Sequence, residues 1–287
     1  MSFKNKLLHA AHKSGGSSET VKARQQTIQN FTAFLKEKNI QLKQTDRIRA
    51  RYIGQYIKEQ KEHGISIRSL QNQMAHFRAV LTTTNNKFKI PTNEQLGLIG
   101  ASRNGVRVAM PLHVYEQARA SLLSAGKDGT AAVLALQKEL GLRSGEAIQS
   151  HRSLKTWENL LQAGAEKVQV LHGTKGGRSR EAYVLNPEKA LEAVREALQV
   201  VSQGNGKLIH GKDLIAARNA FQRDCRSVGL KGKYSPHSLR YRYAQERVQQ
   251  LEKRGYDQRE ARSAVAQDLG HGSGRDRWVN QVYLNKN

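Results

Sequence analysis

Apolar residues recur at helical spacing along most of this chain, so helices must supply most of its core. Val21, Ile28 and Phe31, for example, fall on one face of a helix that Ser17 or Ser18 can cap. Similar stripes predict helices over residues 47–62, 66–81, 114–124, 129–140, 187–202, 212–228, 236–253, 257–269 and 276–284. This periodicity excludes a fold built mainly of strands.

Only one stretch has the pattern of a β-hairpin. Residues 168–172 and 181–185 read as two strands on either side of a turn at 174–179, in which Gly176 and Gly177 are the hairpin signal. The expected fold class is therefore mainly α with a small antiparallel β-sheet (α+β).

The helical pattern breaks around residues 100–110, where glycine, serine, asparagine and arginine replace the apolar stripe. We interpret residues 101–109 as a linker. It divides the chain into a helical domain at 1–104 and a second domain at 105–287, and no internal repeat is evident.

The charge balance predicts a polyanionic partner. Lys and Arg number 48 against 24 Asp and Glu, which gives a net charge of +24, and the basic residues are spread along the chain. Such an excess fits nucleic acid, bound by phosphate neutralisation, better than a membrane surface. The single cysteine, Cys225, allows no disulfide within the chain, and no apolar run is long enough to cross a membrane, so a cytoplasmic protein is expected.

Four short motifs and one late tyrosine carry groups suited to phosphodiester chemistry. In chain order they are Gly-Leu-Arg-Ser-Gly-Glu with Arg143 and Glu146, Thr-Lys-Gly-Gly-Arg with Lys175, Pro-His-Ser-Leu-Arg with His237 and Arg240, Leu-Gly-His with His271, and finally Tyr283. Cations and hydrogen-bond donors of this kind stabilise the charge that builds on phosphate oxygens.

The motif around His237 is the most specific single signal. Ser235 can cap a helix and Pro236 can be its first residue, which would place His237 and Arg240 one turn apart at the helix N-terminus. The free N–H groups of such an end attract anions, so we expect a phosphate to bind there.

The other motif residues are less informative singly. Arg143 follows a glycine that can end a helix, and Glu146 can hold its guanidinium. Lys175 lies at the predicted hairpin tip, where Arg178 and Arg180 favour a position in a DNA groove. A tyrosine phenol has a reference pKa near 10 and is about one part in a thousand ionised at pH 7, so Tyr283 needs cationic neighbours or a base to act as a nucleophile.

Taken together and in this order, the motifs resemble those of the tyrosine recombinase (phage integrase) family. The resemblance covers residues 108–284, and the helical first half resembles that family's core-binding domain. It implies that Tyr283 attacks the scissile phosphate and forms a 3′-phosphotyrosyl intermediate. Arg143 and Arg240 would hold the non-bridging oxygens, with Glu146 supporting the first arginine. Lys175 would protonate the 5′-oxygen, while His237 and His271 would assist with hydrogen bonds and proton movement.

The same resemblance implies that the partner is duplex DNA carrying a recombination site, bound by a homotetramer and assisted by accessory DNA-bending proteins in the nucleoid. No cofactor and no metal are expected, since a phosphotyrosine linkage retains the energy of the bond that it replaces. Two intervals, from Arg240 to His271 and from His271 to Tyr283, are longer than in most members. Three rival interpretations remain: a type IB topoisomerase-like enzyme, a non-catalytic DNA-binding regulator, and a ribonuclease that uses His237 and His271.

The segment leading to Tyr283 is expected to be mobile in the absence of DNA. Gly270, Gly272 and Gly274 surround His271 and give the backbone little stiffness. We therefore expect Tyr283 to lie away from the pocket of arginines and histidines until a target duplex binds.

Overall fold

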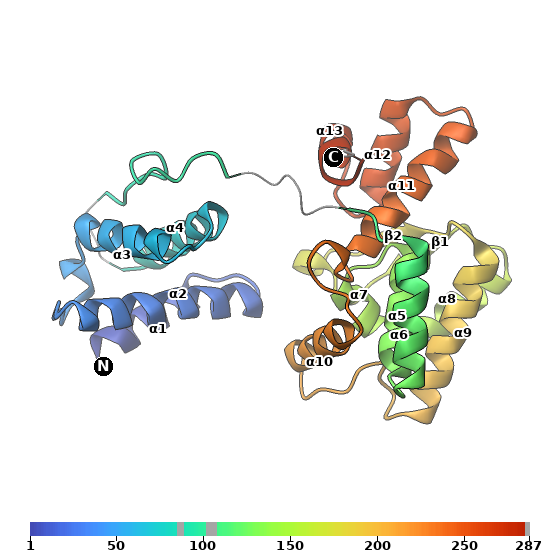
Figure 1. Cartoon of the computed structure of the whole chain (residues 1–287), viewed down its shortest axis with the longest axis horizontal. Coiled ribbons are helices and arrows are strands. Elements are labelled where there is room, and N and C mark those ends of the chain that lie inside the picture. The colour runs from blue at the N-terminus through green and yellow to red at the C-terminus, as the bar shows by residue number, and fades with distance from the viewer. Residues whose placement is uncertain (85–88, 102–107, 285–287) are drawn as a thin grey trace. The chain divides into compact units, whose positions relative to one another are not determined.

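The chain divides into two compact units, residues 1–103 and 104–287 (Figure 1). The computed structural model describes residues 1–84, 89–101 and 108–284. The predicted linker at 101–109 falls largely on residues 102–107, which lie outside the described residues. The expected fold class is confirmed, because each unit consists mainly of helices and the second also contains a two-stranded antiparallel sheet.

Within residues 1–84 and 89–101, the first unit contains four α-helices and one 3₁₀ turn. They are α1 (Phe3–Lys13), α2 (Ser18–Glu37), the turn Thr45–Arg47, α3 (Ala50–Glu62) and α4 (Ile67–Thr82). Ser17 and Ser66 cap α2 and α4, each accepting a bond at its hydroxyl from the backbone N–H three residues on. Helix α1 was not predicted, since its buried face contains only one large residue, Leu7, beside two alanines.

Aromatic side chains form the centre of this unit. Phe31 meets Tyr56 and Phe77 edge-on at ring-centroid distances of 5.6 and 5.0 Å. Phe34 completes the cluster at 5.5 Å from Tyr56. These rings come from α2, α3 and α4, so the stripes recognised in the sequence are core positions.

The second unit holds the remaining elements. They are α5 (Leu112–Ser124), α6 (Asp128–Leu140), α7 (Ser144–Gln149), α8 (Leu154–Gln162), β1 (Lys167–Val170), β2 (Arg180–Tyr183), α9 (Pro187–Gln203), α10 (Leu214–Ser227), α11 (Ser238–Lys253), α12 (Gln258–Asp268), α13 (Asp276–Val279), 3₁₀ turns at Ser150–Arg152, Lys175–Gly177 and Gly232–Tyr234, and a π-helical turn at Asn280–Leu284. The strands pair with Val170 opposite Arg180, and a short 3₁₀ turn at Lys175–Gly177 connects them. Helices α7 and α8 were not predicted.

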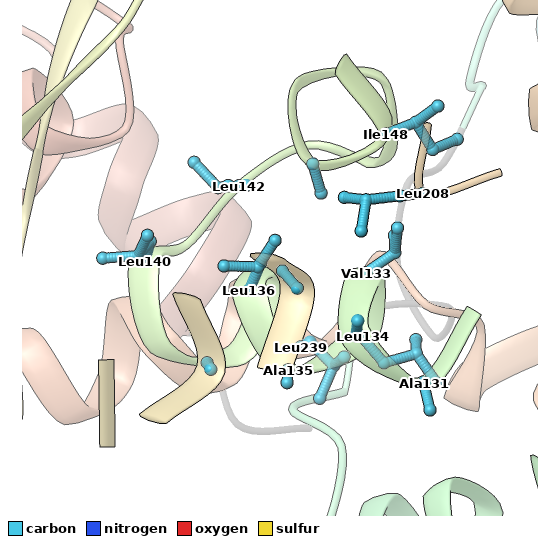
Figure 2. Packing of buried hydrophobic residues seen from close by; sticks show 14 of the residues in the cluster. Ala131, Val133, Leu134, Ala135, Leu136, Leu140, Leu142, Ile148, Leu208 and Leu239 are labelled. Carbon is cyan, nitrogen blue, oxygen red and sulfur yellow. The ribbon is translucent and has the colours of Figure 1, made fainter. Parts of the chain in front are cut away.

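Helix α6 is the centre of this unit and is buried from Thr130 to Leu140 apart from Lys138, with α5, α9 and α11 packed around it. Figure 2 shows Leu140, Leu142 and Leu239 within the same apolar cluster. Leu142 immediately precedes Arg143, and Leu239 immediately precedes Arg240. Core packing therefore fixes the backbone that presents both arginines.

A second apolar cluster anchors the C-terminal segment. It joins α11, α12 and α13 through Val248, Val265, Leu269, Val279 and Val282. In the described part of the chain, no helix combines the length and apolar character that a membrane span requires.

Because each unit has its own core, we predict that they unfold separately. Both tryptophans, Trp157 and Trp278, belong to the second unit, so their fluorescence reports that unit alone. Phe31→Ala should destabilise the first unit by about 3–5 kcal/mol through lost burial and a cavity. In urea unfolding, the circular dichroism signal at 222 nm should acquire an earlier transition while the fluorescence midpoint stays in place. Equal shifts in both signals would show that the chain unfolds as one body.

Candidate active site

The turn after α6 is shaped by close packing. Gly141 has a φ of 58°, and a Cβ at this position would lie 2.5 Å from the ring of Tyr243. As expected from the sequence, this glycine ends the helix. Its carbonyl oxygen accepts hydrogen bonds from Arg240 Nη1 and Arg180 Nη2. The turn thus supplies a buried acceptor for two positive side chains and aims Arg143 at the same region.

Glu146 lies in α7 with a fully buried carboxylate that binds two arginines. One oxygen accepts from Arg143 Nη1, and the other accepts from the backbone N–H of Arg143 at 2.8 Å and from Arg180 Nη2 at 2.7 Å. Burial alone would raise the pKa of this carboxyl, but Arg180, Arg240 and Arg143 outweigh burial and lower the pKa to about 2. The group is therefore charged at neutral pH.

Arg240 is the most deeply buried cation of the site, with 0% of its surface exposed. Its Nη1 donates to the carbonyl of Gly141 and its Nη2 to the carbonyl of Leu269. Arg143 Nη2 donates to the same Leu269 oxygen at 3.1 Å. Burial lowers the pKa of the Arg240 guanidinium to about 10, which still leaves it charged at neutral pH. The shared carbonyl holds the two guanidinium groups next to each other.

The start of α11 differs from the sequence expectation. The helix begins at Ser238, with His237 at the N-cap position and no side-chain capping bond. The backbone N–H groups of Ser238, Leu239 and Arg240 donate to the carbonyls three residues before them. The expectation that this helix end presents free N–H groups is thus wrong, because these three groups are already bonded. His237 itself is exposed, and its ring meets Tyr241 edge-on at 5.3 Å.

Tyr283 is already in place among the basic residues, so the expectation that it lies away from them is wrong. Its hydroxyl is 3.1 Å from His271 Nε2 and 3.4 Å from Arg240 Nε, and 4% of the residue is exposed. Its carbonyl accepts a hydrogen bond from Gln245 Nε2 at 3.0 Å. Apolar burial of Val279 and Val282 outweighs the freedom of the preceding glycines.

The predicted single helix at 276–284 consists of four α-helical residues followed by a π-helical turn. Such turns are rare and are frequent at functional sites. The turn at Gly272–Gly274 and this π-helical turn lie in the long interval between His271 and Tyr283. The length of the interval therefore does not prevent the two side chains from meeting.

His271 follows Gly270, whose φ of 66° ends α12. The imidazole packs against the indole of Trp278 at a centroid distance of 4.1 Å. Burial, together with the charges of Arg240 and Arg143, lowers the pKa of His271 to about 3. The ring is therefore neutral at pH 7, and its Nε2 can accept the proton of the Tyr283 hydroxyl.

These residues surround a cavity of about 1110 Å³. Arg143, Lys175, His237, His271 and Tyr283 all contribute to its wall. Lys175 and Arg178 are exposed and lie in the connection between β1 and β2. Arg240 is absent from the wall, because Tyr283 lies between it and the open space. The structure thus gathers every residue of the motifs, with Arg240 behind the tyrosine and Lys175 at the edge.

Sequence reasoning missed three contributors to this site. Arg180 was cited as support for a hairpin tip in a DNA groove, but it is 8% exposed and binds Glu146, so it gives that interpretation no support. A signal was available, since strand alternation puts Arg180 on the same face as the buried Ala182. Tyr241 and Trp278 pack against Tyr283 at 4.9 and 5.5 Å, and their helical spacing gave no sign of this role.

Two pKa shifts in the site make the free energy of unfolding depend on pH. The depressed pKa of Glu146 stabilises the fold above about pH 4.5, and this contribution is lost as the pH falls towards 2. The folded pKa of His271, about 3, lies below the ordinary value of 6.5. As the pH falls from 6.5 to 3, the unfolded chain therefore binds a proton at His271 that the folded chain does not bind, and the free energy of unfolding decreases.

His271→Gln should remove the second of these dependences. We expect the wild-type protein to lose about 1–2 kcal/mol more than the variant between pH 6.5 and pH 5. The free energy of unfolding is measured in urea by tryptophan fluorescence at each pH. Parallel curves for the two proteins would contradict the assignment of a neutral His271.

Two protein-family models match this chain. The model of a family described as "Integrase" matches residues 97–246, and that described as "Phage integrase, N-terminal" matches residues 1–89. The first match contains Arg143, Lys175, His237 and Arg240 and ends before His271 and Tyr283. No curated protein sequence matches the chain.

Solved structures of low sequence identity share the fold. The Tn1549 transposon integrase in complex with transposon right-end DNA is 13% identical, with a TM-score of 0.60 over 100% of this chain and 96% of that one. The XerH site-specific recombinase bound to its difH substrate is 16% identical, with a TM-score of 0.55 over 93% of this chain and 76% of that one. Since the integrase model spans just over half of the residues, the chain belongs to the integrase family and is an enzyme of the tyrosine recombinase type, which cleaves and rejoins DNA.

Proposed function

We propose that Tyr283 is the nucleophile of this integrase and that the surrounding cavity binds the scissile phosphate. The observation that carries the proposal is the position of the Tyr283 hydroxyl, 3.1 Å from a neutral imidazole and beside a buried guanidinium. A phenol needs both a proton acceptor and positive charge nearby to attack phosphorus at neutral pH.

In the proposed cleavage step, one bond to phosphorus forms, another breaks, and two protons are transferred. Tyr283 Oη forms a bond to phosphorus while its proton passes to His271 Nε2. The bond from phosphorus to the 5′-oxygen breaks, and Lys175 protonates the leaving oxygen. Rejoining reverses these transfers with the 5′-hydroxyl of a new strand, so neither a nucleotide nor a net oxidation is required.

Arg143 and Arg240 stabilise the charge on the non-bridging oxygens, and His237 donates from the cavity wall. Arg143 reaches the cavity directly, held by Glu146 and the carbonyl of Leu269. Arg240 comes within reach as Tyr283 moves towards phosphorus. Donors fixed in this way need little reorganisation during the reaction, which is the main source of their catalytic effect.

The partner in this proposal is duplex DNA carrying a recombination site. The net charge of +24 supports it, as do the related structures solved with DNA. The first unit serves as the core-binding domain and the second as the catalytic domain. Exchange between two duplexes cuts four strands, so a homotetramer with one tyrosine per strand is expected. The proposal also includes accessory proteins that bend the DNA, and a cytoplasmic location of the enzyme at the nucleoid.

Tyr283→Phe tests the nucleophile. A nicked suicide substrate, which releases a short fragment after cleavage, should trap the wild-type protein as a covalent complex on a denaturing gel. The variant should bind the same DNA with similar affinity and form no complex, since it lacks the oxygen that becomes bonded to phosphorus. Tyr256→Phe, which changes an exposed tyrosine outside the cavity wall, is the matched control and should retain covalent trapping. A complex formed by Tyr283→Phe would overturn the assignment.

The two arginines are tested by single-turnover cleavage at saturating DNA. Arg143→Ala and Arg240→Ala should each slow cleavage by about 10²–10³-fold, the effect of losing one fixed donor to a developing negative charge. Lysine at either position should rescue poorly, because it cannot make the planar two-point contact. Arg119→Ala, which removes an ion pair with Glu196 outside the cavity wall, is the control. A near-wild-type rate for either site variant would show that its arginine is misassigned.

A further inference from the structure

Arg180 connects three segments that carry reacting groups. It is the first residue of β2, directly after the turn that holds Lys175. Its Nη2 donates to Glu146 at 2.7 Å, and its Nη1 donates to the carbonyl of Asp268 at 2.5 Å. Asp268 ends α12, three residues before His271. One buried side chain thus touches the supports of Arg143 and His271 and follows Lys175 in sequence.

The contact with Glu146 determines how that carboxylate can hold Arg143. One carboxylate oxygen receives the Arg143 guanidinium, while the other receives the Arg143 N–H and Arg180 Nη2. Arg180 Nε adds a longer bond of 3.4 Å to the first oxygen. This two-point arrangement fixes the plane of the carboxylate, and therefore the direction in which it holds the Arg143 guanidinium.

The apolar stem of Arg180 supports the turn before His271. A Cβ added at Gly270 would lie 2.6 Å from Arg180 Cδ, so the backbone of the turn rests directly on this side chain. The position requires glycine for a second reason, its φ of 66°. The position of the turn at Gly270 therefore depends on the volume of the aliphatic part of the Arg180 side chain. The distance from His271 to Tyr283 depends on the position of this turn.

We infer that Arg180 is a positioning residue for DNA cleavage, acting on Arg143 through Glu146 and on His271 through the Asp268–Gly270 turn. This inference rests on the proposed function of the cavity. Arg180 borders the cavity, but its charged nitrogens donate to Glu146, Asp268, Gly141 and Glu181. None of these acceptors leaves in the proposed reaction, so Arg180 supports the site and does not itself bind the phosphate. A displacement of about 1 Å in a reacting group costs about 10²-fold in rate, which is the effect expected here.

Arg180→Met tests the inference, because it keeps an unbranched apolar stem and removes every donor. Single-turnover cleavage at saturating suicide substrate should slow by about 10²-fold. The dissociation constant for DNA should stay close to that of the wild type, since the side chain is buried and many other cations neutralise phosphates. The loss should therefore appear in the rate of the bound complex and not in binding.

Arg247→Met is the matched control for the loss of a buried ion pair. Arg247 is 6% exposed, pairs with Asp268 at 3.0 Å, and lies over the ring of Tyr183. Arg247 bonds the side-chain carboxylate of Asp268 and not the backbone carbonyl that Arg180 holds, and none of its hydrogen bonds reaches Glu146, Arg143 or the carbonyl of Leu269. It should lower the melting temperature much as Arg180→Met does, while its cleavage rate stays within a few-fold of the wild type.

Two further variants keep the test informative if Arg180→Met does not fold. Arg180→Lys retains the charge and one contact to Glu146, so its rate should fall between those of the wild type and Arg180→Met. Glu146→Gln combined with Arg180→Met removes both members of the buried pair, which avoids an uncompensated charge. Glu146→Gln alone is measured beside it. If Arg180 acts through Glu146, the double variant cleaves no more slowly than Glu146→Gln.

The outcomes separate this inference from the proposed function. A wild-type protein that forms no covalent complex overturns the proposed function. A wild-type protein that does form one, together with an Arg180→Met protein that cleaves as fast as Arg247→Met, overturns the positioning role alone. Slow cleavage by Arg180→Met with unchanged DNA affinity, partial rescue by lysine and a non-additive double variant supports it.

Discussion

The buried carboxylate of Glu146 is the interaction on which the site depends. Three guanidinium groups, those of Arg143, Arg180 and Arg240, lie close enough to it to lower its pKa to about 2. Buried like charges would repel one another strongly without a counter-charge and acceptors. Glu146 supplies the charge, and the carbonyls of Gly141 and Leu269 supply acceptors. Because three groups are positive and one is negative, the site keeps an excess of positive charge, which suits binding of a phosphate.

The same positive field determines what His271 can do. A histidine near phosphate chemistry is often described as an acid, but here burial and the charges of three arginines and Lys175 keep the ring neutral. In the proposed reaction, His271 therefore accepts the proton that Tyr283 loses before attack. Trp278 contributes to this state by packing on the imidazole. The fold separates the two proposed roles, base and acid, in space, because Lys175 lies exposed at the hairpin while His271 is half-buried beside the tyrosine.

Helices, strands and the order of the functional motifs could be predicted because each depends on local spacing. The stripes of α2 and α4, the turn at Gly141 and the strand pair are examples. Partners distant in sequence could not be predicted in the same way. Arg180 and Glu146 are bonded across 34 positions of the sequence. The acceptor at Leu269 is a backbone carbonyl, which every residue has, so the residue type gives no indication of its role. The position expected of Tyr283 was wrong for a related reason, because long-range apolar burial of Val279 and Val282 holds its segment against α11 and α12.

The position of Arg240 behind Tyr283 has a consequence for the energetics of the proposed reaction. In the free protein, Arg240 Nε points to the phenol oxygen, and both terminal nitrogens are held by carbonyls. The guanidinium is therefore fixed before DNA arrives, and its orientation does not have to be established during catalysis. As the phenol oxygen moves to phosphorus, the donor that faced it becomes available to the non-bridging oxygens. An interaction that forms fully only at that stage stabilises the transition state more than bound DNA, which is the condition for faster chemistry as distinct from tighter binding.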